Sequence, residues 1–292
     1  MSTLFHAAPE RARAARLDIG LLNFADRACL RMLHRCEVST CVQLATLIYP
    51  SRRTALRHLR RLWQLGLVER TPLPPNRGGV PIAYRLTRRG TQRLGYSTRR
   101  HGGITQVRHA LDTVAVICSL VRADPPVLRA WMTPVMTGDL LDGLVQPDGI
   151  LILQTDARSG VVCLEVDEAT EHAPQILAKL DAYARVLPAR SGWHALFVVP
   201  NQDRLDWLRR VARWDERPRL AGRVWATTLP DLEDRAIDAP VAAIGFDASA
   251  RTLVRMLADA KDRSSPVPVG SAAWVQMLGS GGAEDLDEGL AW

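Results

Sequence analysis

Three carboxylates stand at the ends of two short apolar segments in the second half of the chain. Asp148 follows a proline inside the segment 144–153, and Glu165 and Asp167 close the segment 161–167. Apolar runs of this length predict buried strands. Because Mg²⁺ prefers hard oxygen ligands and rigid strands hold such ligands in place, the spacing predicts a Mg²⁺ or Mn²⁺ site made by these three carboxylates. In the alternative interpretation, the Pro-Asp pair is only a turn.

The segment after Asp167 predicts a helix that carries a lysine. Thr170 is a candidate N-cap, and Pro174 suits a first helical turn. Apolar residues then recur at helical spacing and predict a helix over 175–187; they are Ile176, Leu180, Tyr183 and Leu187. Lys179 is one of two lysines among 38 basic residues, which favours a role that needs a compact ammonium group. The alternative is an ordinary solvated lysine on a helix.

Together these residues resemble the PD-(D/E)xK nuclease superfamily. The residues that carry the resemblance are, in chain order, Pro147, Asp148, Glu165, Asp167, Gln175, Lys179 and Tyr183. The resemblance implies a divalent metal bound by Asp148 and Glu165, with Asp167 as a third ligand or a neighbouring group. It also implies that Lys179 positions or activates the attacking water. The superfamily's lysine normally stands where this chain has Asp167, and some members supply it from the following helix instead.

Charge is distributed unevenly along the 292 residues. The whole sequence has a formal net charge of +7, but residues 1–103 hold 19 arginines and 5 acidic residues, which gives +14, and residues 104–292 carry −7. This asymmetry predicts a nucleic-acid-binding N-terminal half. No signal peptide or membrane-spanning run is visible, and the 5 cysteines include no Cys-x-x-Cys pair. We therefore expect a cytoplasmic protein with reduced thiols.

Three helices are expected in the basic half, over 23–35, 40–49 and 52–65. Asn23 is the candidate N-cap of the first helix and Ser51 that of the third. Helical spacing then assigns the side chains of the core. Those expected to be buried are Val42, Leu44, Ala45 and Ile48 in the second helix, and Leu56, Leu59, Leu62 and Trp63 in the third.

The third helix points to DNA. No acidic residue occurs in the segment 52–68, whereas a solvated helix face normally mixes charges of both signs. Arginine neutralises phosphates and reaches guanine edges in the major groove of double-stranded DNA. The residues predicted to contact DNA are Arg52, Arg53, Arg57, His58, Arg60, Arg61 and, in the loop that follows, Arg77.

Two strands, over 67–70 and 82–86, enclose a loop that predicts a β-wing. With the three helices they resemble winged helix-turn-helix regulators; a winged helix used only for protein contacts is the alternative. The predicted fold mixes α+β and α/β architecture. It comprises a winged helix-turn-helix domain over 20–98, a PD-(D/E)xK-like mixed-sheet core over 104–260 and a mostly disordered tail over 261–292. The order expected in the core is helix, three strands, helix, strand, helix and a final strand over 224–229.

The combined order of winged helix, Pro-Asp, LEVDEATE and KLDAY resembles the replication-relaxation family of plasmids and other mobile elements. That resemblance implies a DNA-binding protein whose metal-dependent, nuclease-like core nicks or cuts DNA. Because Asp167 replaces the usual lysine, the alternative is a transcription or replication regulator whose inactive core serves dimerisation or partner binding. Winged-helix readers commonly use two-fold symmetry, so we expect a homodimer on double-stranded DNA and no membrane partner.

Overall fold

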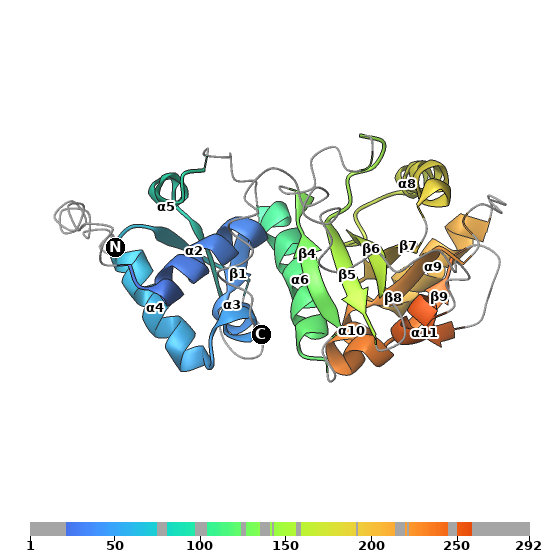
Figure 1. The fold of residues 1–292 in the computed structure, drawn as a ribbon. Coiled ribbons are helices and arrows are strands. Elements are labelled where there is room, and N and C mark those ends of the chain that lie inside the picture. The colour runs from blue at the N-terminus through green and yellow to red at the C-terminus, as the bar shows by residue number, and fades with distance from the viewer. Residues whose placement is uncertain are drawn as a thin grey trace. The chain divides into compact units, whose positions relative to one another are not determined.

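The protein has a mixed α/β fold made of two compact units, Met1–Val114 and Ala115–Trp292 (Figure 1). The structure is a computed structural model. It describes residues 22–74, 81–96, 104–123, 127–134, 141, 143–155, 159–190, 192–213, 220, 222–244 and 250–258. Arg77 and the tail predicted over 261–292 lie outside the described residues.

The first unit combines helices with a small antiparallel sheet. Its helices are α2 (Phe24–Cys36), α3 (Cys41–Ile48), α4 (Arg52–Gln64) and α5 (Arg88–Arg93), and α6 (Ile104–Val121) begins in it. Its described strands are β1 (Val38–Thr40), β2 (Val68–Pro72) and β3 (Ile82–Leu86), in the sheet order β1-β3-β2. The three helices expected in this half are confirmed to within two residues at each end, whereas β1 was not predicted.

Helix capping explains where these helices begin. The Asn23 side chain accepts a hydrogen bond from the backbone N–H of Asp26 at 2.8 Å, as predicted. Thr40 caps α3 by accepting from the N–H of Gln43, whose side chain accepts from the N–H of Thr40 in return. This reciprocal pair satisfies two amide groups that the first turn would otherwise leave unpaired. Ser51 caps α4 in the same way, through the N–H of Thr54.

Two of the side chains that were predicted to be buried in these helices are exposed. The face that α3 buries is formed by Cys41, Leu44 and Leu47, and the face that α4 buries is formed by Ala55, Leu59 and Leu62. Val42 and Leu56, both expected inside, are 51% and 42% exposed. Since adjacent helical residues point about 100° apart, a core face centred one position away is enough to turn these side chains to the surface.

The second unit is built around a long mixed sheet. Its described elements are β4 (Leu128–Met132), β5 (Gly149–Gln154), β6 (Ser159–Val166), α8 (Ala173–Val186), η3 (Leu187–Ala189), β7 (Trp193–Val199), α9 (Gln202–Arg213), β8 (Val224–Thr228), α10 (Leu229–Arg235), η5 (Ala236–Asp238), β9 (Pro240–Ala243), β10 (Ala250–Thr252) and α11 (Leu253–Ala258). These strands form a seven-stranded sheet in the order β10-β9-β8-β7-β6-β5-β4. The three central strands, β6, β7 and β8, run parallel.

The element order predicted for this unit is confirmed up to β8, and the prediction that β8 is the final strand is wrong. β9 and β10 follow it, and both are short strands that pair antiparallel at one edge of the sheet. On one face of the sheet, side chains of the central strands pack against α8 and α9 in a continuous apolar core. The intervening residues of β6, β7 and β8 are buried too, which is why these segments are apolar throughout rather than alternating.

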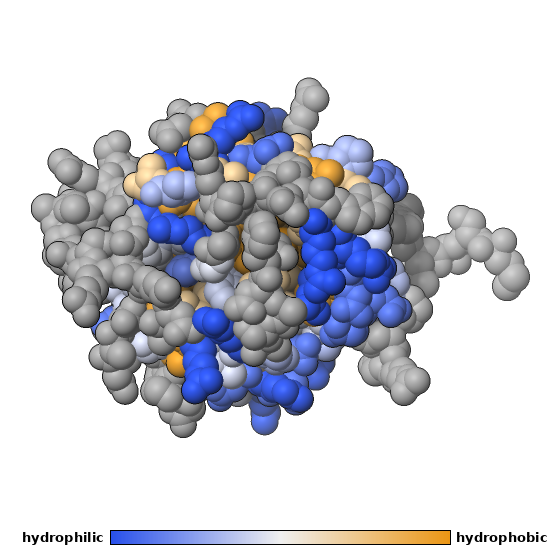
Figure 2. All heavy atoms as spheres, turned by 90° about the vertical axis from the view of Figure 1, so that its right-hand side faces the viewer, coloured by the Kyte–Doolittle hydropathy of each residue, from blue (hydrophilic) through white to orange (hydrophobic). Residues whose placement is uncertain are grey.

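The apolar residues of the described chain are mostly buried within each unit, and so are the cysteines. Among the described residues in Figure 2, hydrophilic side chains dominate the visible face and hydrophobic ones form small, separate patches. Within the described part of the chain, no helix has both the length and the apolar character that crossing a bilayer requires. The five cysteines are buried and form no disulfide.

His194 of β7 introduces a pH-dependent group into the core of the second unit. The residue is 3% exposed. Burial and the positive charge of Arg223 lower its pKa from 6.5 to about 4. The folded protein therefore keeps His194 neutral at a pH where the unfolded chain binds a proton.

We predict that this difference makes the protein less stable in mild acid. The contribution of His194 should be fully present above pH 6.5 and lost as the pH falls toward 4, at a total cost of about 3 kcal/mol. Urea unfolding followed by circular dichroism should show the loss in the wild type and in the control His172→Leu, which changes an exposed histidine. His194→Leu should remove this part of the pH dependence; the same acid-induced loss in that variant would contradict the assignment.

Candidate functional site

The pairing of β5 with β6 brings two of the predicted carboxylates together where these neighbouring strands begin and end. Gly149 pairs with Leu164, so Asp148 and Glu165 stand next to each other at the point where β5 begins. The backbone N–H of Asp148 donates to the carbonyl of Leu164 at 2.9 Å. The Asp148 carboxylate in turn accepts from the N–H of Val166 at 2.7 Å. Asp148 is thus held against β6 by a hydrogen bond of its backbone and by one of its side chain.

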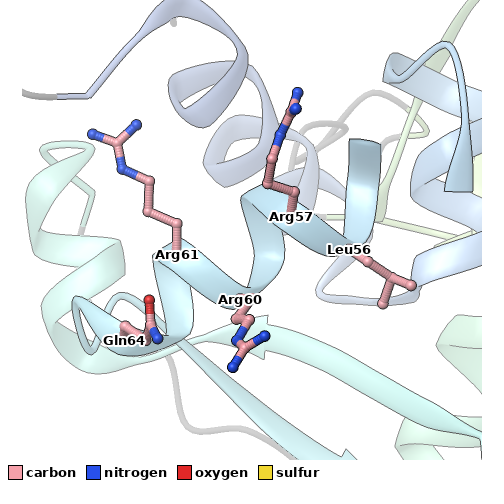
Figure 3. A pocket seen from close by; sticks show the side chains of 5 residues that line it. All are labelled: Leu56, Arg57, Arg60, Arg61 and Gln64. Atoms are coloured by element: carbon pink, nitrogen blue, oxygen red, sulfur yellow. The ribbon is translucent and has the colours of Figure 1, made fainter. Parts of the chain in front are cut away.

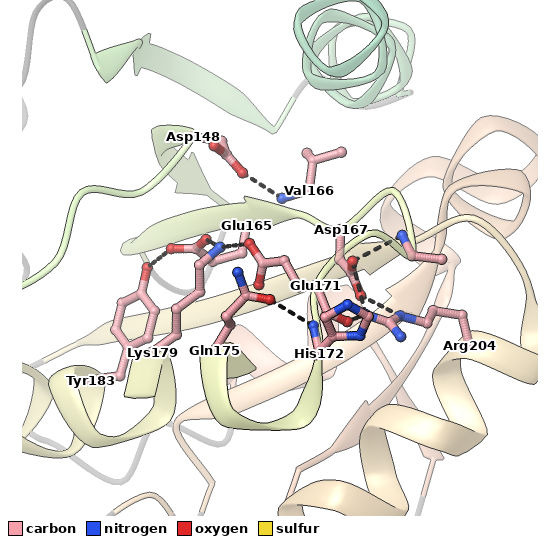
Figure 4. Close-up of polar contacts among 11 residues, drawn as sticks. Asp148, Glu165, Val166, Asp167, Glu171, His172, Gln175, Lys179, Tyr183 and Arg204 are labelled. Atoms are coloured by element: carbon pink, nitrogen blue, oxygen red, sulfur yellow. Dashed lines mark hydrogen bonds and ion pairs between the residues drawn. The ribbon is translucent and has the colours of Figure 1, made fainter. Parts of the chain in front are cut away.

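Glu165 is a buried acid with two partners on α8. It is 1% exposed and lies on the face of the sheet that α8 covers. Its carboxylate accepts from the Tyr183 hydroxyl at 2.6 Å and from the Lys179 amine at 2.8 Å. Figure 4 shows both side chains reaching Glu165 from the helix. Lys179 also contacts the Glu171 carboxylate at 2.7 Å, so one ammonium group joins two acids.

Helix α8 begins later than the sequence predicted. Its N-cap is His172, not Thr170, and the N–H of His172 donates to the side chain of Gln175 at 2.8 Å. Pro174 lies in the first turn, as expected. The apolar face of Ile176, Leu180 and Tyr183 is buried as predicted, and this packing sets the rotation of the helix that turns Lys179 toward Glu165.

The charges around Glu165 oppose one another. Burial and the neighbouring Asp148 carboxylate raise the pKa of Glu165 to about 7, although Lys179 and Tyr183 act in the opposite direction. Burial lowers the pKa of Lys179, but Glu165 and then Glu171 outweigh it, so its pKa lies above the usual range. Burial, followed by the charge of Glu165, raises the pKa of Tyr183 well above 10. The hydroxyl therefore remains a hydrogen-bond donor, and the acidic pair is favourable only with cations beside it.

Asp167 is placed in a different ion pair. It is 4% exposed, and its two carboxylate oxygens lie 2.6 Å and 3.1 Å from the Nε and Nη2 atoms of Arg204 on α9. Arg204 stacks on the ring of Trp207 and donates to the carbonyl of Glu171 at 2.6 Å. The structure thus brings Asp148, Glu165 and Lys179 together and gives Asp167 a guanidinium partner of its own.

This arrangement limits the number of side chains that could bind a metal ion together. In the ranges that the structure describes, no three His, Cys, Asp or Glu side chains are grouped so that they could hold one. The acids that face each other are Asp148 and Glu165. Two carboxylates fit Mg²⁺, because this ion usually retains waters and is completed by substrate phosphates.

The outer face of α4 is the second candidate site. The predicted DNA contacts Arg52, Arg53, Arg57, Arg60 and Arg61 are exposed, while the His58 side chain is mostly buried, with 11% exposed. A shallow pocket on this face is lined by Leu56, Arg57, Arg60, Arg61 and Gln64 (Figure 3). The face therefore offers a dense positive charge and one leucine to a binding partner.

Two of the residues predicted to contact DNA also have a structural partner. Asp26 of α2 is completely buried. Its carboxylate lies 2.7 Å from Nδ1 of His58 and 2.9 Å from Nη1 of Arg61. These contacts join α2 to α4 and fix how α4 is rotated about its axis.

Sequence reasoning missed Asp26, Glu171 and Arg204 as members of these sites. No role at a candidate site was predicted from the sequence for any of the three. Each acts through a partner that is distant in sequence or comes from another element. Hydrophobic periodicity carries no signal for such pairs.

Removal of Arg204 tests whether it neutralises Asp167. We predict that Arg204→Leu lowers the free energy of unfolding by about 3 kcal/mol, because it leaves a buried carboxylate without its counter-charge. Arg210→Leu, on an exposed position of the same helix, should change stability by no more than about 0.5 kcal/mol. In chemical unfolding, the double variant Asp167→Asn/Arg204→Leu should lose less than the two single variants added together. Additive losses would contradict the pairing.

A comparison with known families matches a segment that includes residues of both candidate sites. A model of the replication-relaxation family matches residues 30–199, which include α4, Asp148, Glu165 and Lys179. Asp26 and Arg204 lie outside the matched segment. No curated protein is similar enough to the chain to count as a relative. The match covers more than half of the 292 residues and confirms the resemblance noted in the sequence: the chain belongs to the replication-relaxation family.

Proposed function

We propose that this replication-relaxation protein binds the DNA of a plasmid or mobile element through its N-terminal unit and nicks or cuts it with a divalent-metal, nuclease-like core. Membership of the family supports a role connected with replication of such an element. The observation that carries the proposal is the outer face of α4, which exposes five arginines on a helix without any acidic residue. The positive charge of such a face complements the negative charge of a DNA backbone.

The N-terminal unit is proposed to be a winged helix-turn-helix domain over 20–98. In its favour, the elements α2, β1, α3, α4, β2 and β3 follow one another in the order of that fold, and β3 lies between β1 and β2 in the sheet. In this assignment α4 is the helix that enters the major groove. The hairpin of β2 and β3 is the wing.

A PD-(D/E)xK-like core is proposed over 104–260, a range that includes the sheet of the second unit. A mixed sheet with a buried acid at its centre and a lysine on the next helix supports this assignment. Asp148 and Glu165 would hold Mg²⁺ or Mn²⁺, which lowers the pKa of a bound water and offsets charge on a phosphate. Lys179 would orient the attacking water or stabilise the charge on the phosphate. Tyr183 fixes the carboxylate of Glu165, and Arg204 positions the loop that carries Glu171.

A catalytically inactive core is the second candidate function. The observation that favours it is the ion pair of Asp167 with Arg204, because Asp167 occupies the position at which the superfamily usually places its lysine. The protein would then be a DNA-binding regulator whose core serves dimerisation or partner binding. A homodimer on DNA remains a prediction in either case.

Binding to DNA should be strongly dependent on salt. Replacing Arg53, Arg57 and Arg60 together by alanine should weaken binding and flatten the plot of log affinity against log salt, by about one unit for each phosphate that the protein no longer neutralises. Fluorescence polarisation with labelled duplex DNA measures both quantities.

The matched control replaces Arg210, Arg213 and Arg235, three exposed arginines of the second unit. This variant removes the same charge and should keep most of the salt slope. Equal losses in the two triple variants would mean that net charge, and not the face of α4, governs binding.

A divalent metal should stabilise the protein through the carboxylate pair. Mg²⁺ or Mn²⁺ at about 100 times its dissociation constant should add roughly 2.7 kcal/mol by mass action, visible as a higher melting temperature. Asp148→Asn and Glu165→Gln should each abolish the gain, because each removes one of two charges that face the ion. Asp167→Asn is the control that should retain it, since Asp167 is paired with Arg204.

Variants of Lys179 test DNA cleavage separately from DNA binding. Lys179→Ala should abolish cleavage of supercoiled DNA while leaving DNA affinity unchanged, and Lys179→Arg should rescue cleavage poorly because a planar guanidinium differs in shape from an ammonium group. Melting that is independent of metal, together with no cleavage by the wild type, would eliminate the nuclease and leave the regulator.

A further inference from the structure

The most exposed face of the first unit's charged helix includes an apolar side chain. Leu56 is 42% exposed, although the sequence pattern assigned it to the core. It lies in the first half of α4, next to Arg57 and one turn before Arg60. In Figure 3 it stands at one end of the labelled row and Gln64 at the other, with the arginines between them.

The surroundings of Leu56 select the kind of partner that could cover it. The pocket that it lines is completed by Arg57, Arg60, Arg61 and Gln64, so the apolar surface is flanked by guanidinium groups without a carboxylate. In the major groove of DNA, the 5-methyl group of thymine is an apolar surface between two rows of phosphates. A groove with this chemistry complements the leucine and its neighbouring arginines at the same time.

The internal contacts of α4 determine which of its side chains can reach a partner. Asp26 holds His58 and Arg61 on one side of the helix, while Ala55, Leu59 and Leu62 are buried against the core. The rotation of α4 is therefore fixed, and Leu56, Arg57 and Arg60 are left on the outside. Residues near the beginning of a helix that enters the major groove are the ones that contact base edges.

We propose that Leu56 is a specificity-determining residue that contacts the 5-methyl group of a thymine, beside guanines read by Arg57 or Arg60. The proposal rests on DNA binding by α4, which is the proposed function. It assigns a thymine, and not merely a phosphate, to this face. The arginines then supply most of the affinity and Leu56 supplies a preference among bases.

Uracil substitution tests the contact, because uracil differs from thymine by that methyl group alone. The preferred site is first selected from randomised duplexes with the full-length chain, and each thymine in it is then replaced by uracil. At one thymine, the wild type should bind the uracil duplex about fourfold more weakly, the loss expected for one methyl group returned to water. Leu56→Ala should bind the two duplexes equally, as a double-mutant cycle requires for a direct contact.

Phe24→Ala is the matched control. Phe24 is also an exposed apolar residue, 58% exposed, but lies at the start of α2. This variant should retain the wild-type difference between thymine and uracil. Equal thermal stability of the wild type and Leu56→Ala, expected for an exposed side chain, shows that the comparison concerns binding alone.

Four outcomes would overturn the proposal. If the selection yields no preferred sequence, or if Leu56→Ala keeps the thymine preference at every position, Leu56 does not read the base, although α4 still binds DNA. If Leu56→Ala leaves DNA binding intact but changes the molecular mass in light scattering, a second copy of the chain covers this face. If the wild type binds no duplex at all, the proposed function fails together with the proposal.

Discussion

The buried carboxylate of Glu165 is the constraint on which the second unit depends. An acid in the middle of a sheet is tolerated only when its oxygens are hydrogen-bonded and its charge is offset. Tyr183 and Lys179 meet these needs from one helix, so α8 must lie over β6 with its rotation fixed. The apolar packing of Ile176 and Leu180 provides that rotation. The same geometry places Asp148 next to Glu165 at the start of β5, so two acids lie close together at this end of the strands.

The first unit also contains a buried carboxylate, that of Asp26, whose charge must be offset. This acid is buried in α2 and is shared by His58 and Arg61 of α4. In both units, a buried carboxylate orients a helix through basic partners on that helix, and the remaining face of the helix is left for other contacts. The cost of burying an acid is offset in each case by a defined orientation, which apolar packing alone specifies less sharply.

Sequence patterns predicted the parts of this protein that follow from local rules. The strand β7 was predicted in its correct place between two helices because all seven of its residues are buried and apolar patterning is strong there, and the apolar face of α8 followed from helical spacing. Val42 and Leu56 were misplaced because periodicity leaves the centre of a helix face uncertain by one position. The strands β1, β9 and β10 are three or four residues long, too short for a pattern to build up. The partners of Asp167 and Asp26 were missed because an ion pair between distant elements has no local periodicity. Spacing predicted that Asp148 and Glu165 belong to one site, and the family resemblance added Lys179 to it.

The division of α4 into held and outward positions also has a practical consequence. His58 and Arg61 are tied to Asp26, and Ala55, Leu59 and Leu62 belong to the core, whereas Leu56, Arg57, Arg60 and Gln64 are exposed and can be exchanged at little cost to folding. A combinatorial library confined to these four codons would therefore vary this exposed surface on an unchanged scaffold. The residues that hold α4 in place are thus separate from those that it exposes, so the chemistry of the exposed face could be changed without redesigning the fold.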